Sequence, residues 1–418
     1  MIKFLYTMEI DMKLLKENNK IHEISPSVYT DTGYSNDSNK QNINYTFKFL
    51  YAIGIIIIVS GHCKTGGGIN LFYDWFTPYA FNLALFTFCS GYFYKDINER
   101  NVKKYILKKV KKLIIPMYIW NIAYAIFDQI IKLKGFQFGN SINLKSIVID
   151  PLINGHQFAF TLALWYVVPL FCIEIINILV RKIINILKIQ KNEYIFFIVS
   201  LLFGLIGTYF SNKGYNKNLY LFLNRIFYLL QFFYFGILYN RKLEKHDKMN
   251  NLAYFFIIFA IQLAVITKYG HTVAVTPSWC NFKNTKLLIT PFLIGFIGIL
   301  FWLRVARIME PITKNCKIIN CIANHTYSIM VHHFFAFFII KTIYAVLSKI
   351  MPCFKDFNWI SYKLKFGYYY LPKGINQYYI IYLIAGIIIP ILIEEMLNKI
   401  KEIIKNSLFV MNGKLEKF

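Results

Sequence analysis

Long apolar runs, separated by short basic segments, dominate the pattern of this chain. A transmembrane helix needs about 20 mostly apolar residues, within a range of about 17–25. The runs are continuous and lack the alternation of barrel strands, and lipid tolerates only helices or closed barrels. The pattern therefore predicts an all-α integral membrane protein, a bundle of about ten transmembrane helices at residues 46–62, 75–94, 113–131, 160–180, 194–211, 219–239, 251–268, 287–304, 325–347 and 378–396.

Polar segments precede and follow this predicted membrane domain. Residues 1–45 include the polar stretch NDSNKQNIN and lack the apolar core and the small-residue cleavage site of a signal peptide. We expect three parts: a polar cytoplasmic N-terminal arm at 1–45, the ten-helix membrane domain at 46–396 and a basic cytoplasmic C-terminal tail at 397–418.

The composition excludes a water-soluble enzyme. Hydrophobic residues make up 56% of the 418 residues and charged residues only 16%, whereas soluble domains carry about 25% charged residues. Lys and Arg number 47 against 21 Asp and Glu, a net charge of +26. Nucleic-acid-binding proteins gather their basic residues on one solvated face, but here the basic residues lie between the apolar runs. We therefore expect the lipid bilayer, and no nucleic acid, as a partner.

The distribution of the basic residues predicts the orientation. With the N-terminus inside, the inner segments carry 30 Lys and Arg and the outer loops 14. Cytoplasmic loops of membrane proteins carry the excess of these residues. The chain is therefore predicted to be a multi-pass protein of the cell membrane with both termini in the cytoplasm.

Ionisable residues inside the predicted spans are candidates for function, because they are costly to place in lipid. By position along the spans they form two groups at opposite sides of the membrane. The outer group is His62, Asp128 and Arg225, and the inner group is Lys48, Glu174, His332 and His333.

His62 is the strongest single candidate. It ends the first span at a water-accessible position and leads into CKTGGG, whose glycines allow a ligand close to the backbone. Histidine is suited to general-base catalysis near neutral pH. Two interpretations stay open: a catalytic base, or a histidine that anchors a helix end at the interface.

Lys48 lies on the same helix face as His62. The two are 14 residues apart, which corresponds to a rise of about 21 Å. A cation at the inner end and a base at the outer end would suit the two ends of a long molecule. The alternative is a lysine that only extends to the inner interface.

A basic segment precedes the third span. Residues 98–116, NERNVKKYILKKVKKLIIP, have the spacing of an interfacial amphipathic helix running into that span. Its lysines would bind either anionic lipid headgroups or the phosphates of a nucleotide-like cofactor. The seven cysteines show no metal-ligand spacing, so no metal is expected; Cys280 and Cys353 fall in predicted outer loops and are candidates for a disulfide.

Several short motifs follow one another in a definite order along the chain. The first span ends in His, as in LYAIGIIIIVSGH, and FCSGYFYK closes the second. A basic stretch then leads to a proline, as in KKVKKLIIP. Further motifs are LWYVVPL, Arg225 followed by FFYFG, and TYSIMVHH, which ends at His333. Together they span most of residues 46–340, and their order resembles the acyltransferase-3 family of polytopic membrane O-acyltransferases.

The resemblance implies an enzyme that moves an acyl group, most simply acetyl, from acyl-CoA at the cytoplasmic face to a hydroxyl of a surface polysaccharide or lipid-linked sugar. His62 would be the general base, and Arg225 would stabilise the oxyanion or pair structurally with Asp128. Ser90 is interpreted as a packing residue beside Gly91, not a nucleophile. The catalytic candidates are thus His62, Arg225 and Asp128, and the candidates for binding acetyl-CoA or another acyl-CoA are Lys48, Ser90, Tyr92, Lys108, Lys109, Lys112 and His333.

One departure from the family pattern concerns donor binding. The family's Arg eleven residues before the His is replaced by Tyr51, and the acidic residue three positions earlier by Lys48. We hypothesise that Lys48 supplies the missing cation. Two other functions stay open: a non-catalytic partner in glycan export, and a small-solute transporter, although the broken repeats of transporters are not found.

Overall fold

The computed structural model describes residues 43–63, 75–76, 78–270, 273, 275–282, 285 and 287–415. The predicted N-terminal arm and the glycine-rich loop after His62 lie almost wholly outside these residues. Within the described ranges the chain is all-α; one isolated β-bridge joins Thr276 and Asn281. The prediction of an all-α membrane protein is therefore confirmed.

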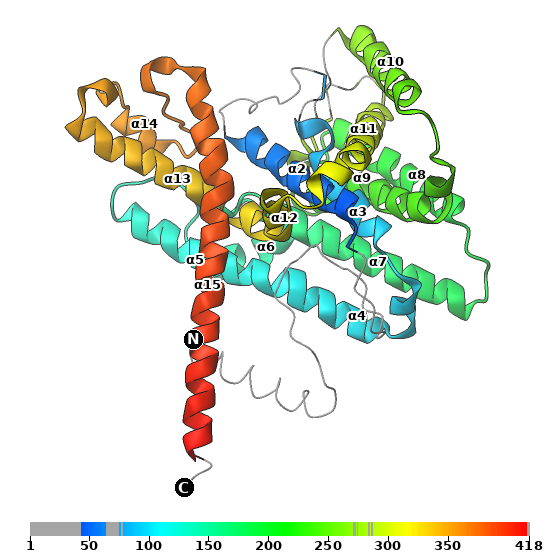
Figure 1. The fold of residues 1–418 in the computed structure, drawn as a ribbon, viewed down its shortest axis with the longest axis horizontal. Helices are drawn as coiled ribbons and strands as arrows, with labels where there is room; N and C mark the ends of the chain where they lie inside the picture. The colour runs from blue at the N-terminus through cyan, green and yellow to red at the C-terminus, as the bar shows by residue number, and fades with distance from the viewer. Residues whose placement is uncertain are drawn as a thin grey trace.

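The helices follow one another in the order shown in Figure 1. Short 3₁₀ turns occur in the connections, and a π-helical turn at Val110–Ile114 joins α4 to α5. The helices are α2 (Tyr45–His62), α3 (Pro78–Tyr92), α4 (Val102–Lys109), α5 (Ile115–Lys132), α6 (Asp150–Ile153), α7 (Val167–Ile186), α8 (Glu193–Asn212), α9 (Asn218–Leu238), α10 (Asn251–Tyr269), α11 (Thr290–Thr313), α12 (Lys317–Asn324), α13 (Thr326–Ile350), α14 (Trp359–Leu364) and α15 (Tyr379–Leu415).

Eight helical segments of the described chain are long and apolar enough to cross a membrane, fewer than the ten predicted. Every predicted span contains a helix, but two do not qualify. Helix α3 has only 15 residues, and α7, which begins at Val167 and not at 160, carries Glu174, Arg181 and Lys182. Helix α3 is largely buried in the bundle, whereas α7 buries one face and exposes apolar side chains such as Ile183 on the other.

The boundaries also differ from prediction at the basic segment and at the C-terminus. The basic segment is helical and runs into the third span, as predicted, because α4, the π-helical turn and α5 form one helix over Val102–Lys132. Its position at a membrane interface stays a prediction. The predicted C-terminal tail begins within α15, which continues from the last predicted span through Leu415. Figure 1 shows the C-terminal half of α15 projecting alone beyond the bundle.

Contacts of α2 define two ends of the bundle. At the beginning of α2, called here the Lys48 end, Thr46 donates to Glu310 on α11 and Lys48 donates to Asn324 on α12. At its last residues, called the His62 end, the Tyr79 hydroxyl of α3 donates to the Gly61 carbonyl over 2.5 Å. Helix α3 therefore runs antiparallel to α2.

Two glycines allow α3 and α9 to approach each other closely. A Cβ on Gly91 would lie 1.9 Å from the Phe233 carbonyl oxygen, and a Cβ on Gly236 would lie 2.1 Å from that of Phe88. Backbone atoms cannot yield to such an overlap. The close approach expected at Gly91 is thus confirmed, whereas the packing role of Ser90 stays a prediction.

Ion pairs among the described residues gather at the Lys48 end. Arg181 binds both oxygens of the Glu193 carboxylate, which also pairs with Arg241. A second group joins the end of α9 to α11, where Arg307 pairs with Asp247 over 2.5 Å and with Glu244 over 3.0 Å. Arg–carboxylate pairs of this kind fix geometry through parallel hydrogen bonds. They tie together the helix ends that surround the pocket described below.

Candidate functional site

The side chains of His62 and His333 are in contact. His62 Nδ1 lies 3.0 Å from His333 Nε2, and the two rings are nearly parallel with centroids 5.1 Å apart. His333 is fully buried, whereas His62 is half-buried. The sequence placed these residues at opposite sides of the membrane, and that prediction is wrong.

The position of His333 along α13 explains the error. Asn324, the last residue of α12, accepts from Lys48, so α13 begins about level with the first turn of α2, at the Lys48 end as predicted, but His333 lies more than two helical turns farther along. His62 lies 14 residues beyond Lys48, a rise of about 21 Å, and His333 lies nine residues beyond Asn324, a rise of about 13 Å. The tilt between the helices and the reach of the side chains close the remaining gap.

The hydrogen bonds of the pair determine which nitrogens carry protons. His333 Nδ1 lies 2.9 Å from the Ile329 carbonyl oxygen, which only accepts. His333 Nδ1 therefore carries a proton, and in the neutral ring Nε2 is the acceptor. That acceptor is satisfied by a proton on His62 Nδ1. The unprotonated nitrogen of His62 is thus Nε2, as general-base catalysis requires.

Aromatic residues hold the end of α2 around this pair. The Tyr369 hydroxyl donates to the His62 carbonyl over 2.8 Å, and the ring of Phe334 lies against both imidazoles. On the opposite side of α13, His332 Nδ1 lies 2.6 Å from the Tyr124 hydroxyl of α5. The two adjacent histidines therefore bind different helices, and only His333 contacts His62.

Arg225 and Asp128 are not part of the His62–His333 pair. The buried guanidinium of Arg225 donates to the backbone carbonyls of Asn154 and Ser278, at 2.9 Å and 3.0 Å, and to that of Ile153. Asp128 accepts from the Ala159 backbone N–H over 3.1 Å. The predicted structural pairing of Arg225 with Asp128 is therefore wrong, because each is occupied by backbone groups of loops.

His156 lies outside the membrane helices and contacts Arg225. Its Nδ1 lies 3.4 Å from Arg225 Nη2. Burial and, to a lesser extent, the positive charge of Arg225 lower the pKa of His156 to about 3. The imidazole is therefore neutral at pH 7.

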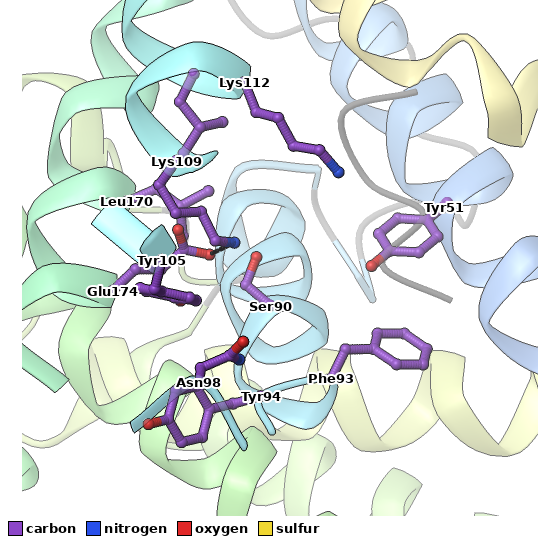
Figure 2. Close-up of a pocket in the computed structure, with 11 residues that line it drawn as sticks. Tyr51, Ser90, Phe93, Tyr94, Asn98, Tyr105, Lys109, Lys112, Leu170 and Glu174 are labelled. Atoms are coloured by element: carbon purple, nitrogen blue, oxygen red, sulfur yellow. Dashed lines mark hydrogen bonds and ion pairs between the residues drawn. The ribbon is translucent and has the colours of Figure 1, made fainter. Parts of the chain in front are cut away.

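A pocket opens at the Lys48 end (Figure 2). It lies between α2, the end of α3, the basic helical segment formed by α4 and the π-helical turn, and α7. It has a volume of about 560 Å³, including its open mouth. Its lining includes three of the predicted donor-binding residues, Ser90, Lys109 and Lys112, together with Tyr51 and Glu174. Lys109 Nζ contacts the Glu174 carboxylate at 2.7 Å. Figure 2 shows the Lys112 side chain directed toward Tyr51 across the pocket. The remaining lining residues are Phe93, Tyr94, Asn98, Tyr105, Leu113 and Leu170.

The other four predicted donor-binding residues do not line this pocket, and one of them, His333, lies at His62 instead. Lys48 is bonded to Asn324, and Tyr51, one turn farther along α2, occupies the pocket instead. The Tyr92 hydroxyl donates to Glu244 over 2.8 Å. Lys108 is exposed on the neighbouring face of α4. The lysines of α4 alternate between faces because they lie on a helix.

Sequence reasoning missed the partners of the candidate residues. Tyr124 and Tyr369 were indistinguishable from other interfacial tyrosines, and His156 and Trp279 stand alone in connections. The predicted position of His156 and Trp279 at the same end as Arg225 was the one feature of the sequence that could have pointed to them.

Among the described residues, no group of three or more His, Cys, Asp and Glu side chains is arranged to hold a metal ion. Cys280 is buried, Cys353 is exposed and both are free, so the suggested disulfide is wrong.

Comparison with known families identifies the chain. The model of the acyltransferase-3 family, described as an acyltransferase domain, matches residues 44–395. No curated protein and no solved structure matches the chain. The match covers α2 through most of the apolar part of α15, including the histidine pair and the pocket. The chain therefore belongs to the acyltransferase-3 family and is a membrane acyltransferase.

Proposed function

We propose that this acyltransferase moves an acyl group, most simply acetyl, from acyl-CoA to a hydroxyl of a surface polysaccharide or a lipid-linked sugar. The observation that carries the proposal is the His62–His333 pair, which leaves His62 Nε2 as a proton acceptor at one end of the bundle. The basic pocket at the other end supports a donor with phosphate groups.

The pocket suits the nucleotide part of acyl-CoA. Lys109 and Lys112 provide ammonium groups, and Tyr94 and Tyr105 provide aromatic surface. Tyr51 and His62 lie 11 residues apart on α2, a rise of about 16 Å. Acyl-CoA carries its thioester at the end of a long flexible arm, so a donor held at Tyr51 would extend its acyl group along α2 toward His62.

The reaction follows from the protonation states of the pair. His62 Nε2 takes the proton of the acceptor hydroxyl as its oxygen attacks the thioester carbonyl carbon. The C–S bond then breaks, and the sulfur of CoA leaves with the proton returned by His62. General-base catalysis of this kind contributes about 10²- to 10⁴-fold to the rate. His333 holds the imidazole by accepting from Nδ1 and is a positioning residue.

The orientation is part of the proposal. The Lys48 end would face the cytoplasm, where acyl-CoA is made, because the excess of Lys and Arg lies in the segments at that end. The His62 end would face outward, toward a surface acceptor.

Transfer by the purified protein tests the proposal. Protein in lipid nanodiscs is incubated with acetyl-CoA or a longer acyl-CoA. The acceptor is polysaccharide isolated from the surface of the cells in which the protein naturally occurs. We expect release of free CoA thiol and formation of an ester, both reduced at least 100-fold in His62→Ala. His246→Ala, which changes an exposed histidine in the connection after α9, is the matched control and should keep full activity.

Three results would contradict it. Ester formation that is undiminished in His62→Ala would remove His62 as the base. An equal loss in His246→Ala would show that the effect is not specific to the pair. Binding of the polysaccharide without any ester formation by the wild type would favour the export partner over the enzyme that esterifies this glycan.

A further inference from the structure

An exposed tryptophan at the His62 end is held in one orientation by its neighbours. Trp279 lies in a 3₁₀ turn, Pro277–Trp279, between α10 and α11, and it is 55% exposed. Its ring stacks on the imidazole of His156, with centroids 4.2 Å apart and planes 27° apart. The two residues come from connections more than 120 positions apart in the chain. The stack therefore depends on the relative position of these connections.

Arg225 fixes that relative position. It is 1% exposed and donates to Ile153 and Asn154 in one connection and to Ser278 in the other. Its guanidinium also lies 4.6 Å from the ring centroid of Trp165. Hydrogen bonds from a charged donor are stronger than those between neutral groups. A buried cation thus joins the two chain segments that carry His156 and Trp279.

The same arginine determines the protonated nitrogen of His156. A guanidinium only donates, so His156 Nδ1, at 3.4 Å from Nη2, is the acceptor. His156 Nε2 therefore carries the proton. The low pKa of about 3 keeps this ring neutral at working pH. A half-buried histidine then offers a neutral N–H donor beside the exposed indole.

The Trp279–His156 stack and the His62–His333 pair lie at the same end of the bundle. Tyr269, the last residue of α10, bonds to Thr290, the first residue of α11, over 2.6 Å, and the turn that carries Trp279 lies between these helices. The other end of α11 contacts the beginning of α2 through Glu310. Because α11 and α2 are antiparallel, the Trp279 connection is on the side where α2 ends at His62.

We propose that Trp279 and His156 form a sugar-stacking platform for a pyranose unit of the acceptor glycan. The face of an indole is electronegative and attracts the C–H hydrogens on the face of a pyranose ring, while the His156 Nε2–H is a donor for a ring hydroxyl. The platform carries no net charge of its own at neutral pH. It therefore favours a neutral sugar unit, some distance along the polymer from the one that is acylated.

An interfacial tryptophan that only anchors a membrane helix would not need this construction. Anchoring depends on the amphipathic character of the side chain, and rotation of the indole would not impair it. Here one face is covered by His156 and a buried arginine fixes both supporting connections. The construction defines which face of the indole remains open.

The inference rests on the proposed function, so its test measures binding and transfer separately. Oligosaccharides of one to six units, released from the surface polysaccharide of the producing cell, are titrated into protein in nanodiscs by calorimetry. We expect Trp279→Ala to raise the Kd of the longer oligosaccharides about tenfold, equal to about 1.4 kcal/mol. The acceptor KM should rise by the same factor, with the KM for acyl-CoA and kcat unchanged.

Variants separate stacking from anchoring and from folding defects. Trp279→Phe keeps an aromatic face and should stay within about threefold of the wild type, while the apolar Trp279→Leu should bind as weakly as Trp279→Ala. The matched control is Trp359→Ala. Trp359 is another exposed tryptophan, 36% exposed, and is the first residue of α14, with Lys349 over its ring. Its removal should leave oligosaccharide binding unchanged.

The outcomes distinguish the platform from the proposed function. Equal oligosaccharide affinity in wild type and Trp279→Ala overturns the platform, even if acyl transfer proceeds. An equal loss in Trp279→Leu and Trp279→Phe, or in Trp359→Ala, also overturns it. Oligosaccharide binding that depends on Trp279 without any acyl transfer would support the platform and overturn the proposed function.

Discussion

The two ends of the bundle bind their buried cations in different ways. At the Lys48 end, Arg181, Arg241 and Arg307 are paired with carboxylates. At the His62 end, Arg225 binds backbone carbonyls, and the buried Lys341 donates to the Phe366 carbonyl over 2.7 Å. One end is thus held by ion pairs, the other by cations that organise loops.

This difference is consistent with different ligands. A network of ion pairs can surround a basic pocket and keep it rigid while some lysines face a phosphate-bearing donor. Carbonyls do not cancel the charge of Arg225 and Lys341, but both side chains are buried and donate to backbone groups. The groups that the platform of Trp279 and His156 exposes are an indole face and a neutral imidazole. Such a surface fits a neutral sugar better than an anionic one.

The largest effect is expected from removing the cation that organises the His62 end. Arg225→Ala removes a buried cation and leaves three part-buried carbonyls without their donor, and an unsatisfied group costs about 1–3 kcal/mol when it is fully buried. We expect the unfolding free energy to fall by about 3 kcal/mol or more, measured as a lower Tm by tryptophan fluorescence in detergent. Arg241→Ala, at the other end, should lower it by less, because that side chain is 20% exposed and Glu193 keeps Arg181. An equal loss in both variants would remove the distinction between the ends.

The next effect concerns the partner of His62. His333→Ala removes the acceptor of the His62 Nδ1–H, and by analogy with groups that orient metal-bound histidines we expect kcat to fall about 10- to 100-fold. His333→Gln, whose amide oxygen can accept that bond, should recover part of the loss. Both KM values should stay close to those of the wild type. A rise in the KM for acyl-CoA instead would return His333 to the donor-binding role predicted from the sequence.

A smaller effect is expected in the donor pocket. Lys109→Ala leaves the Glu174 carboxylate facing the proposed phosphates without its 2.7 Å partner, and we expect the KM for acyl-CoA to rise about tenfold, or about 1.4 kcal/mol. The double variant Lys109→Ala/Glu174→Gln should lie closer to the wild type, because the repulsion is removed as well. Additive effects in this double-mutant cycle would show that the ion pair does not govern donor binding.

The smallest effect is expected from Lys48, the cation suggested by the sequence. It bonds to Asn324 and is absent from the pocket lining, whereas Lys112 is part of it. Lys48→Ala should change the KM for acyl-CoA less than about twofold, and Lys112→Ala about tenfold. The reverse order would assign the missing family cation to Lys48 and would extend the donor site toward the first turn of α2.

The apolar pattern alone determined the helices, because burial in lipid requires long uninterrupted runs that can be read locally. It also found His62 and two of the pocket lysines, since both lie in motifs with their own spacing. It could not determine that α3 is too short to qualify as a membrane-spanning helix, because a buried helix and a membrane helix have similar composition.

Only the tertiary structure decided which side chains meet. Depth read from the sequence assumes that every helix begins at the membrane surface and runs perpendicular to it. Helix α13 begins beside Lys48, at the expected end, but His333 lies nine residues beyond Asn324, and the tilt between the helices and the reach of the side chains bring it to His62. Arg225 and Tyr92 likewise contact groups from connections that the sequence places far away. Their partners lie on other helices and loops, and local periodicity contains no information about those contacts.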